Sequence, residues 1–167
     1  MLEHMITVIG SEAPGRAVLS GLLGAGMSPG QVLVGVPDKN ETIPDRHAAE
    51  DLAGSLGLRT APVWNCADAD LVLLAVPPEQ VDQVVQHIKP KIDAGGVVIS
   101  CVPGVPVAQI EGNLPGESAV VQVLPDEAVI AGRHGTCVVA PGTAAVPEDV
   151  ARVKDLFATM ADVVDRP

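Results

Sequence analysis

The chain has 167 residues, of which 47% are hydrophobic and 19% charged, enough apolar material for one folded domain with a sizeable core. Its 10 Lys and Arg against 21 Asp and Glu give a formal net charge of -11, which makes nucleic acid a poor partner. One Trp, one Phe and no Tyr exclude aromatic stacking platforms, so aliphatic residues must build the core.

Strand and helix signals alternate along the chain. Short aliphatic runs typical of buried parallel strands lie at residues 6–9, 32–34, 71–76, 97–99 and 119–124. Helical patterns lie between or after them at residues 15–25, 46–56, 78–88, 107–113 and 147–160. This alternation predicts an α/β fold, a doubly wound and mainly parallel Rossmann-type sheet with helices on both faces.

The N-terminal residues and the lengths of the apolar runs define the limits of the folded domain. Residues 1–4, which include Leu2-Glu3-His4, resemble a vector remnant, although an ordinary native N-terminus is the alternative. The longest apolar runs, such as residues 71–76, are far shorter than the roughly 20 residues that span a bilayer. We therefore expect no membrane partner and a folded domain over residues 5–167.

The cysteines indicate a reduced protein without a metal. Cys66, Cys101 and Cys137 lack the paired spacings of a zinc site or a disulfide framework, so we expect reduced thiols and a cytoplasmic location. A reactive Cys101 would need a neighbouring base, and no histidine has a recognisable partner spacing. Acidic pairs such as Glu148-Asp149 are explained by helix termini and turns, so no metal site is predicted.

A glycine-containing loop follows the first predicted strand. It reads Gly10-Ser11-Glu12-Ala13-Pro14-Gly15, where a dinucleotide-binding fold has Gly-x-Gly-x-x-Gly. Glu12 stands at the middle glycine, where the diphosphate would approach, and Pro14 lacks a backbone N–H. A strand–turn–helix corner that binds nothing explains two glycines equally well, so both interpretations remain open.

The end of the second predicted strand bears on the choice of nucleotide. NAD-binding folds usually carry an Asp or Glu at this tip, whereas this chain has Val36-Pro37-Asp38-Lys39-Asn40. The apolar strand end, with Lys39 and Asn40 beyond it, favours NADP over NAD if a nucleotide binds. The alternative is an ordinary polar turn.

A series of segments resembles, in order, the N-terminal domain of the pyrroline-5-carboxylate reductase family over residues 5–165. They are Ile9-Gly10 with Gly15-Arg16-Ala17, Ser20 to Leu23, Ser28-Pro29-Gly30-Gln31, Val36-Pro37-Asp38, Asp70 to Pro78, Val98 to Val105 and Val121 to Asp126. The resemblance implies hydride transfer from NAD(P)H to the ring imine of 1-pyrroline-5-carboxylate, giving proline. It also implies a helical dimerisation domain, supplied by further residues or a partner chain, without which residues 5–167 would not turn over substrate.

Carried over from the family, the cofactor-binding residues would be Gly10, Ser11, Glu12, Ala13, Gly15, Pro37, Asp38, Lys39, Ala75, Val76, Pro77, Cys101, Val102 and Pro103. No residue has the type, position and partner of a general acid, so the catalytic residue is left unknown. The acidic surface favours a monomer unless the missing helical domain leaves an apolar patch exposed, which we would expect around Leu156 and Phe157 or at Val163-Val164.

Departures from the family motifs collect at the cofactor loops. They are Glu12 for Gly, Pro62 near a ribose-contacting Asn, Pro77 for Lys, Pro103 for Ala, and Asp126-Glu127-Ala128 for Asn-Thr-Pro. A second hypothesis is therefore a non-catalytic Rossmann-fold module that binds no nucleotide and serves assembly or regulation. A third is a related small reductase acting on another imine or a deazaflavin.

Overall fold

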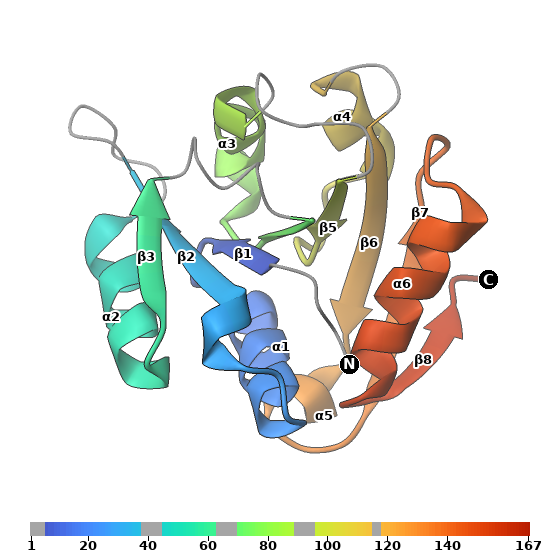
Figure 1. The fold of residues 1–167 in the computed structure, drawn as a ribbon. Coiled ribbons are helices and arrows are strands. Elements are labelled where there is room, and N and C mark those ends of the chain that lie inside the picture. The colour runs from blue at the N-terminus through green and yellow to red at the C-terminus, as the bar shows by residue number, and fades with distance from the viewer. Residues whose placement is uncertain (1–5, 38–44, 63–69, 89–95, 115–117) are drawn as a thin grey trace.

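The computed structural model describes residues 6–37, 45–62, 70–88, 96–114 and 118–167. Eight strands form one sheet in the order β3-β2-β1-β4-β5-β6-β7-β8 (Figure 1). Their bounds are β1 Ile6–Ile9, β2 Val32–Val36, β3 Arg59–Pro62, β4 Leu71–Leu74, β5 Val97–Ser100, β6 Ala119–Pro125, β7 Thr136–Pro141 and β8 Asp162–Asp165. The first six in this order are mutually parallel, and β7 runs antiparallel to β6. The prediction of a mainly parallel Rossmann-type sheet is confirmed.

Helices cover both faces of the sheet, as predicted. They are α1 Ala13–Gly24, α2 Arg46–Leu56, α3 Val81–Ile88, α4 Val107–Gly112, α5 Glu127–Ile130 and α6 Pro147–Ala158, with 3-10 turns η1 Pro29–Gln31 and η3 Pro78–Gln80. One buried cluster contains residues of α1, α2, α5 and α6, and a second contains residues of α3 and α4. Figure 1 shows α3 and α4 on the opposite side of the sheet from α1 and α2.

The central strands supply side chains to both cores. In β4, Leu71 and Leu73 belong to the cluster under α1 and α2, whereas Val72 and Leu74 belong to the cluster under α3 and α4. All four are at most 2% exposed. Such alternation of two buried faces is why the parallel strands are continuous apolar runs in the sequence.

Several predicted boundaries and one predicted surface differ from the structure. The run at residues 71–76 ends as a strand at Leu74, and the helix expected at 78–88 is divided into η3 and α3. Helix α1 begins at Ala13 rather than residue 15, because Pro14 suits the first turn of a helix. The expected apolar patch at Leu156 and Phe157 is wrong, since α6 buries both against the sheet at 2% and 0% exposure.

No helix in the ranges that the structure describes is long and apolar enough to cross a membrane. Residues 1–4, Cys66 and the sequence-predicted cofactor residues Asp38 and Lys39 lie outside these ranges.

Candidate functional site

The candidate site lies at the carboxyl ends of β1 and β4, which are neighbours in the sheet. The strand order reverses between them, since β2 follows on the far side of β1 and β5 on the far side of β4. In open α/β sheets such a reversal creates a crevice outside the strand ends. The loop that leads into α1 and the residues after β4 meet in this crevice, where the Glu12 N–H donates to the Ala75 carbonyl at 2.9 Å.

Gly10 and Gly15 both pack too closely against Ala75 for any side chain. Gly10 has φ of +101°, and a Cβ there would stand 2.2 Å from the Ala75 carbonyl oxygen. A Cβ on Gly15 would stand 2.1 Å from the Ala75 Cβ. The first and third glycines of the loop therefore do what a dinucleotide loop requires of them, a tight turn and close packing of helix on strand.

A cavity of about 220 Å³ opens at this crevice. Its lining residues are Gly10, Ser11, Glu12, Asp45, Ala48, Val76, Pro77 and Gln80. Five of the fourteen predicted cofactor residues thus come together here. Sequence reasoning missed Asp45, whose side chain caps α2 by accepting from the Ala48 N–H at 3.0 Å. An Asp directly before a helical pattern is the signal that could have located it.

The charges and donors of the loop determine what it can bind. Glu12 and Asp45 bring two exposed carboxylates to the rim of this cavity. Pro14 has no N–H, and the Glu12 N–H is already bonded to Ala75. The amides of Ala13 and Gly15 have no acceptor among the described residues, so two donors of the first turn of α1 are available to an anion.

The guanidinium of Arg46 lies at the end of β2, a position that the sequence analysis did not predict. Pro37 is buried directly after β2, and its carbonyl accepts a hydrogen bond from Nη2 of Arg46, the first residue of α2. The contact joins residues nine positions apart, on either side of a segment outside the described ranges. No local sequence pattern predicts a contact of this kind.

The remaining predicted cofactor residues differ in their access to solvent. Ala75, Val76, Cys101 and Val102 are each at most 2% exposed, so neither their side chains nor their backbones offer more than a trace of surface to a ligand. Pro103 is exposed, and it precedes a cavity of about 460 Å³ between Gly104 to Pro106 and the β6–β7 pair. Within it the buried Gln122 amide donates to the Val105 carbonyl at 3.2 Å.

The two described cysteines are buried in the core. Burial, with Cys137 as a second cause, raises the pKa of the Cys101 thiol far above its ordinary value. Burial, with Asp126 as a second cause, raises the pKa of Cys137 to about 11. Neither thiol is a nucleophile at neutral pH, because nucleophilicity needs the thiolate.

We accordingly expect Cys101 and Cys137 to resist an aromatic disulfide reagent in the native protein. In a Cys66→Ser background, no thiol should react within minutes at about pH 8, where an ordinary thiol is partly ionised. Both should react once the chain is unfolded in denaturant. Rapid native labelling of either thiol would contradict the structural role given to them here.

Asp126, at the position of the Asn in the family motif, fastens α5 and β7 together. Its Oδ1 accepts from the Val129 N–H at 3.0 Å and its Oδ2 from the Thr136 N–H at 2.9 Å. These hydrogen bonds, Val129 first and Thr136 second, lower the pKa of the Asp126 carboxyl below its ordinary value. The departure from the family motif therefore has a structural function.

The lowered pKa gives a pH dependence with a definite sign. The stability that Asp126 contributes is fully present above the pKa of the unfolded carboxyl and is lost as pH falls through the lower folded pKa. Asp126→Asn should therefore lower the Tm near pH 7, and the difference from wild type should shrink toward zero near pH 2. Asp155→Asn, at an exposed position of α6, is the control for the loss of one carboxylate. A Tm difference that stays constant with pH would contradict this explanation.

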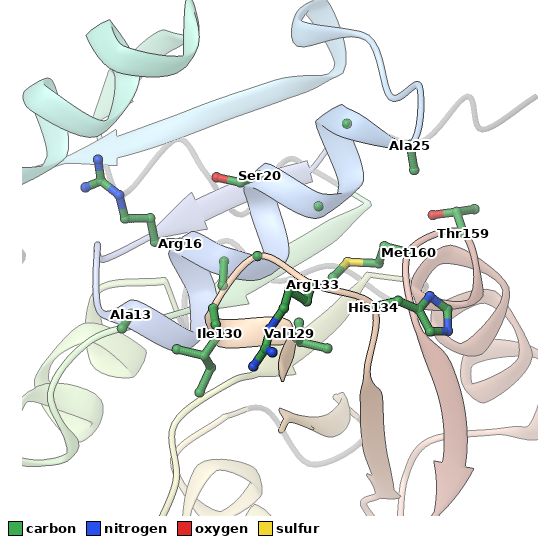
Figure 2. A pocket seen from close by; sticks show the side chains of 15 residues that line it. Ala13, Arg16, Ser20, Ala25, Val129, Ile130, Arg133, His134, Thr159 and Met160 are labelled. Carbon is green, nitrogen blue, oxygen red and sulfur yellow. The ribbon is translucent and has the colours of Figure 1, made fainter. Parts of the chain in front are cut away.

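A larger cavity of about 660 Å³ lies apart from the crevice, between α1, α5 and the end of α6 (Figure 2). Of the predicted cofactor residues only Ala13 lines it. Figure 2 shows Arg16 and Arg133 pointing in different directions, so the two guanidinium groups do not converge on one ligand. His134 on its rim pairs with Asp162 at 3.2 Å. In the described ranges no group of three or more His, Cys, Asp or Glu is placed to hold a metal.

Comparisons with known proteins agree with the architecture. A family model described as "NADP oxidoreductase coenzyme F420-dependent" matches residues 5–104. Pyrroline-5-carboxylate reductase of Corynebacterium melassecola is 31% identical over 163 residues, which cover 96% of this chain and 58% of that protein.

Solved structures show the same fold at lower identity. A pyrroline-5-carboxylate reductase from Coxiella burnetii has a TM-score of 0.83 and 22% identity, over 99% of this chain and 60% of that one. Pyrroline carboxylate reductase of Plasmodium falciparum with NADP bound has a TM-score of 0.79 and 20% identity, over 100% of this chain and 59% of that one. The chain thus spans less than two thirds of the length of these relatives.

Proposed function

Because the chain belongs to the family of coenzyme F420-dependent NADP oxidoreductases and corresponds to the N-terminal domain of pyrroline-5-carboxylate reductases, we propose that it is the NADPH-binding domain of such a reductase. The observation that carries the proposal is the packing of Gly10 and Gly15 against Ala75 at the reversal of strand order. This packing brings the start of α1 close to the carboxyl ends of β1 and β4, as a dinucleotide-binding loop requires.

The residues present fit a dinucleotide, with a weakened diphosphate site. The free amides of Ala13 and Gly15 at the start of α1 would face the diphosphate. The adenosine would lie toward Pro37 and Arg46, and the nicotinamide toward the strand ends after β4 and β5. When bound, NADPH supplies the hydride for reduction of a cyclic imine.

No described residue at this edge has the type, position and partner of a general acid. We therefore propose that proton donation and the rest of the substrate pocket come from a helical domain or a partner chain, and that the domain alone binds cofactor without turnover.

A second function is favoured by a specific observation, the two carboxylates of Glu12 and Asp45 at the rim of the crevice. Negative charge at this place opposes a diphosphate. If it prevents binding altogether, the domain is a Rossmann-fold module for assembly or regulation rather than half of a reductase.

Calorimetric titration of the chain with NADPH and NADH separates the two functions. The reductase proposal expects saturable NADPH binding in the micromolar range and weaker binding of NADH. Absence of binding at millimolar NADPH, both for wild type and for a Glu12→Gly variant, would establish the non-catalytic module instead.

A further inference from the structure

The cavity of about 660 Å³ between α1, α5 and the end of α6 lies outside the crevice of the proposed nucleotide site. A second cavity of about 420 Å³ follows the end of α1 toward η1, and the two cavities share the lining residues Ala25 and Thr159. They therefore form one groove along α1, which we call the α1 groove. Because a helix rises about 1.5 Å per residue, residues 13–25 give this groove a length of about 18 Å.

The side of the α1 groove that belongs to α1 consists of small residues. They are Ala13, Ala17, Ser20, Gly21 and Gly24. Their steps of three and four residues place them along one side of the helix. At Gly24 a Cβ would meet nothing within 4 Å, so the groove is open there. Small side chains let a second helix approach closely, because the distance between packed helices depends on the side chains between them.

The facing wall, made by residues 129–134 and the end of α6, supplies apolar surface. Ile130 is 40% exposed, and only two other large hydrophobic side chains in the described ranges are exposed. Met160 is half-buried and packs toward α1, since a Cβ on Gly21 would stand 2.6 Å from its Cε. Figure 2 shows Ile130 and Met160 at this wall. The α1 groove therefore fits a partner with an apolar side.

The formal charges that line the α1 groove are positive. Arg16 and Arg133 line it, and no Asp or Glu among the described residues does, although the chain has 21 acidic and 10 basic residues. Both arginines are exposed, and neither forms an ion pair with a described residue. Arg133 acts on Asp126 only as the smallest of the causes that lower the pKa of that carboxyl.

Figure 2 shows the guanidinium groups of Arg16 and Arg133 pointing in different directions. No single anionic group meets both, so the complementary partner carries acidic groups at separate places along its length. We propose that the α1 groove binds an acidic amphipathic helix of another protein. Its apolar side lies on the small residues of α1 and against Ile130, and its carboxylates pair with the two arginines.

A second copy of this chain fits the α1 groove less well. Each of the six described helices already buries one side in a hydrophobic cluster, so a copy has no described helix left to enter the groove. A formal net charge of -11 on each chain also opposes the association of copies at low salt. A short helix carries few charges, so the local attraction of the arginines exceeds this repulsion more easily.

The test selects ligands for the whole chain from random peptides of about 16 residues displayed on phage, a length at which an isolated helix can form. Enriched peptides are then titrated by fluorescence anisotropy against matched variants. Arg16→Glu and Arg133→Glu are compared with Arg166→Glu, which reverses an exposed cation beside the cavity at β6 and β7. Gly24→Trp fills the groove, and Gly54→Trp on α2 is its control, because a Cβ meets nothing within 4 Å at either glycine. Thermal unfolding verifies the fold of each variant.

We expect the enriched peptides to be acidic, with apolar residues at steps of three and four. Arg16→Glu and Arg133→Glu should each weaken them about fivefold, since each reversal replaces an exposed ion pair by repulsion. Gly24→Trp should weaken them at least about tenfold, and both controls should stay within about twofold of wild type. Raising the ionic strength should weaken binding to wild type.

Three results would overturn this inference: no enriched peptides, enriched peptides without an acidic excess, or equal effects of the groove variants and their controls. Self-association of wild type in analytical ultracentrifugation that Gly24→Trp abolishes would assign the α1 groove to a second copy, and would overturn it as well. The proposed function is tested separately, because the NADPH titration concerns a different cavity.

Discussion

Replacing Gly15 by alanine is expected to lower the free energy of unfolding by about 3 kcal/mol, at the upper end of what overpacking a core costs. The added methyl would stand 2.1 Å from the Ala75 Cβ, and both atoms belong to rigid backbone elements. Helix α1 would have to move away from the end of β4. Chemical denaturation followed by circular dichroism measures the loss.

Ala75→Gly provides a rescue that is specific to this contact. Without its Cβ, residue 75 leaves its Cα as the nearest atom, 3.4 Å from the methyl at position 15. The double variant should regain about 2 kcal/mol relative to the sum of the single variants, a coupling expected only for residues in contact. Gly54→Ala is the matched control, because nothing lies within 4 Å of a Cβ there and α2 should gain about 0.5–1 kcal/mol. Additive effects of Gly15→Ala and Ala75→Gly would show that the packing is not as described.

The sequence predicts the central strands well and the sheet edges badly, for a physical reason. Strand β4 is buried on both faces, so all its residues are aliphatic. Strand β3 lies at the edge of the sheet, reads Arg-Thr-Ala-Pro, and has no buried residue. Its pairing with β2 comes from the neighbouring backbone rather than from a hydrophobic pattern.

The last part of the chain was predicted only in outline. Helix α5 has four residues, too few for a helical period to be visible. Strand β8 reads Asp-Val-Val-Asp at the other edge of the sheet, and its Val164 is 46% exposed. Acidic residues at an edge strand discourage pairing with other chains. They also interrupt the apolar run by which a strand is recognised in the sequence.

The residues of the candidate site also fall into two groups, those that the sequence predicted and those that it missed. Gly10, Glu12 and Gly15 were found because their meaning depends on local spacing after a strand. The helix-cap pattern could have located Asp45 as the start of α2, but its place beside the loop after β1, like the contact of Arg46 with Pro37, depends on where α2 begins in space. Local geometry can be read from the sequence, whereas convergence through tertiary contacts cannot.

Glu12→Gln is expected to tighten NADPH binding by about tenfold, because it removes one negative charge from the rim of the diphosphate site while keeping the size of the side chain. The effect should fall as salt is raised, since the position is exposed to solvent and the interaction is screened. Calorimetry at low and high ionic strength measures both quantities on the same protein.

The comparison of glutamine with glycine at position 12 separates charge from shape. Glu12 has φ of -60° and ψ of 150°, an extended conformation that any residue adopts, so neither variant relieves backbone strain. If charge alone opposes the diphosphate, Glu12→Gln and Glu12→Gly should bind NADPH equally well. A further gain in the glycine variant would show that the side chain itself occupies the approach to the loop.

Asp45→Asn tests the second carboxylate, although its cap on α2 must be monitored by thermal unfolding. Wild-type affinity in all three variants would mean that the carboxylates do not limit binding, and that the donors left at Ala13 and Gly15 determine it instead.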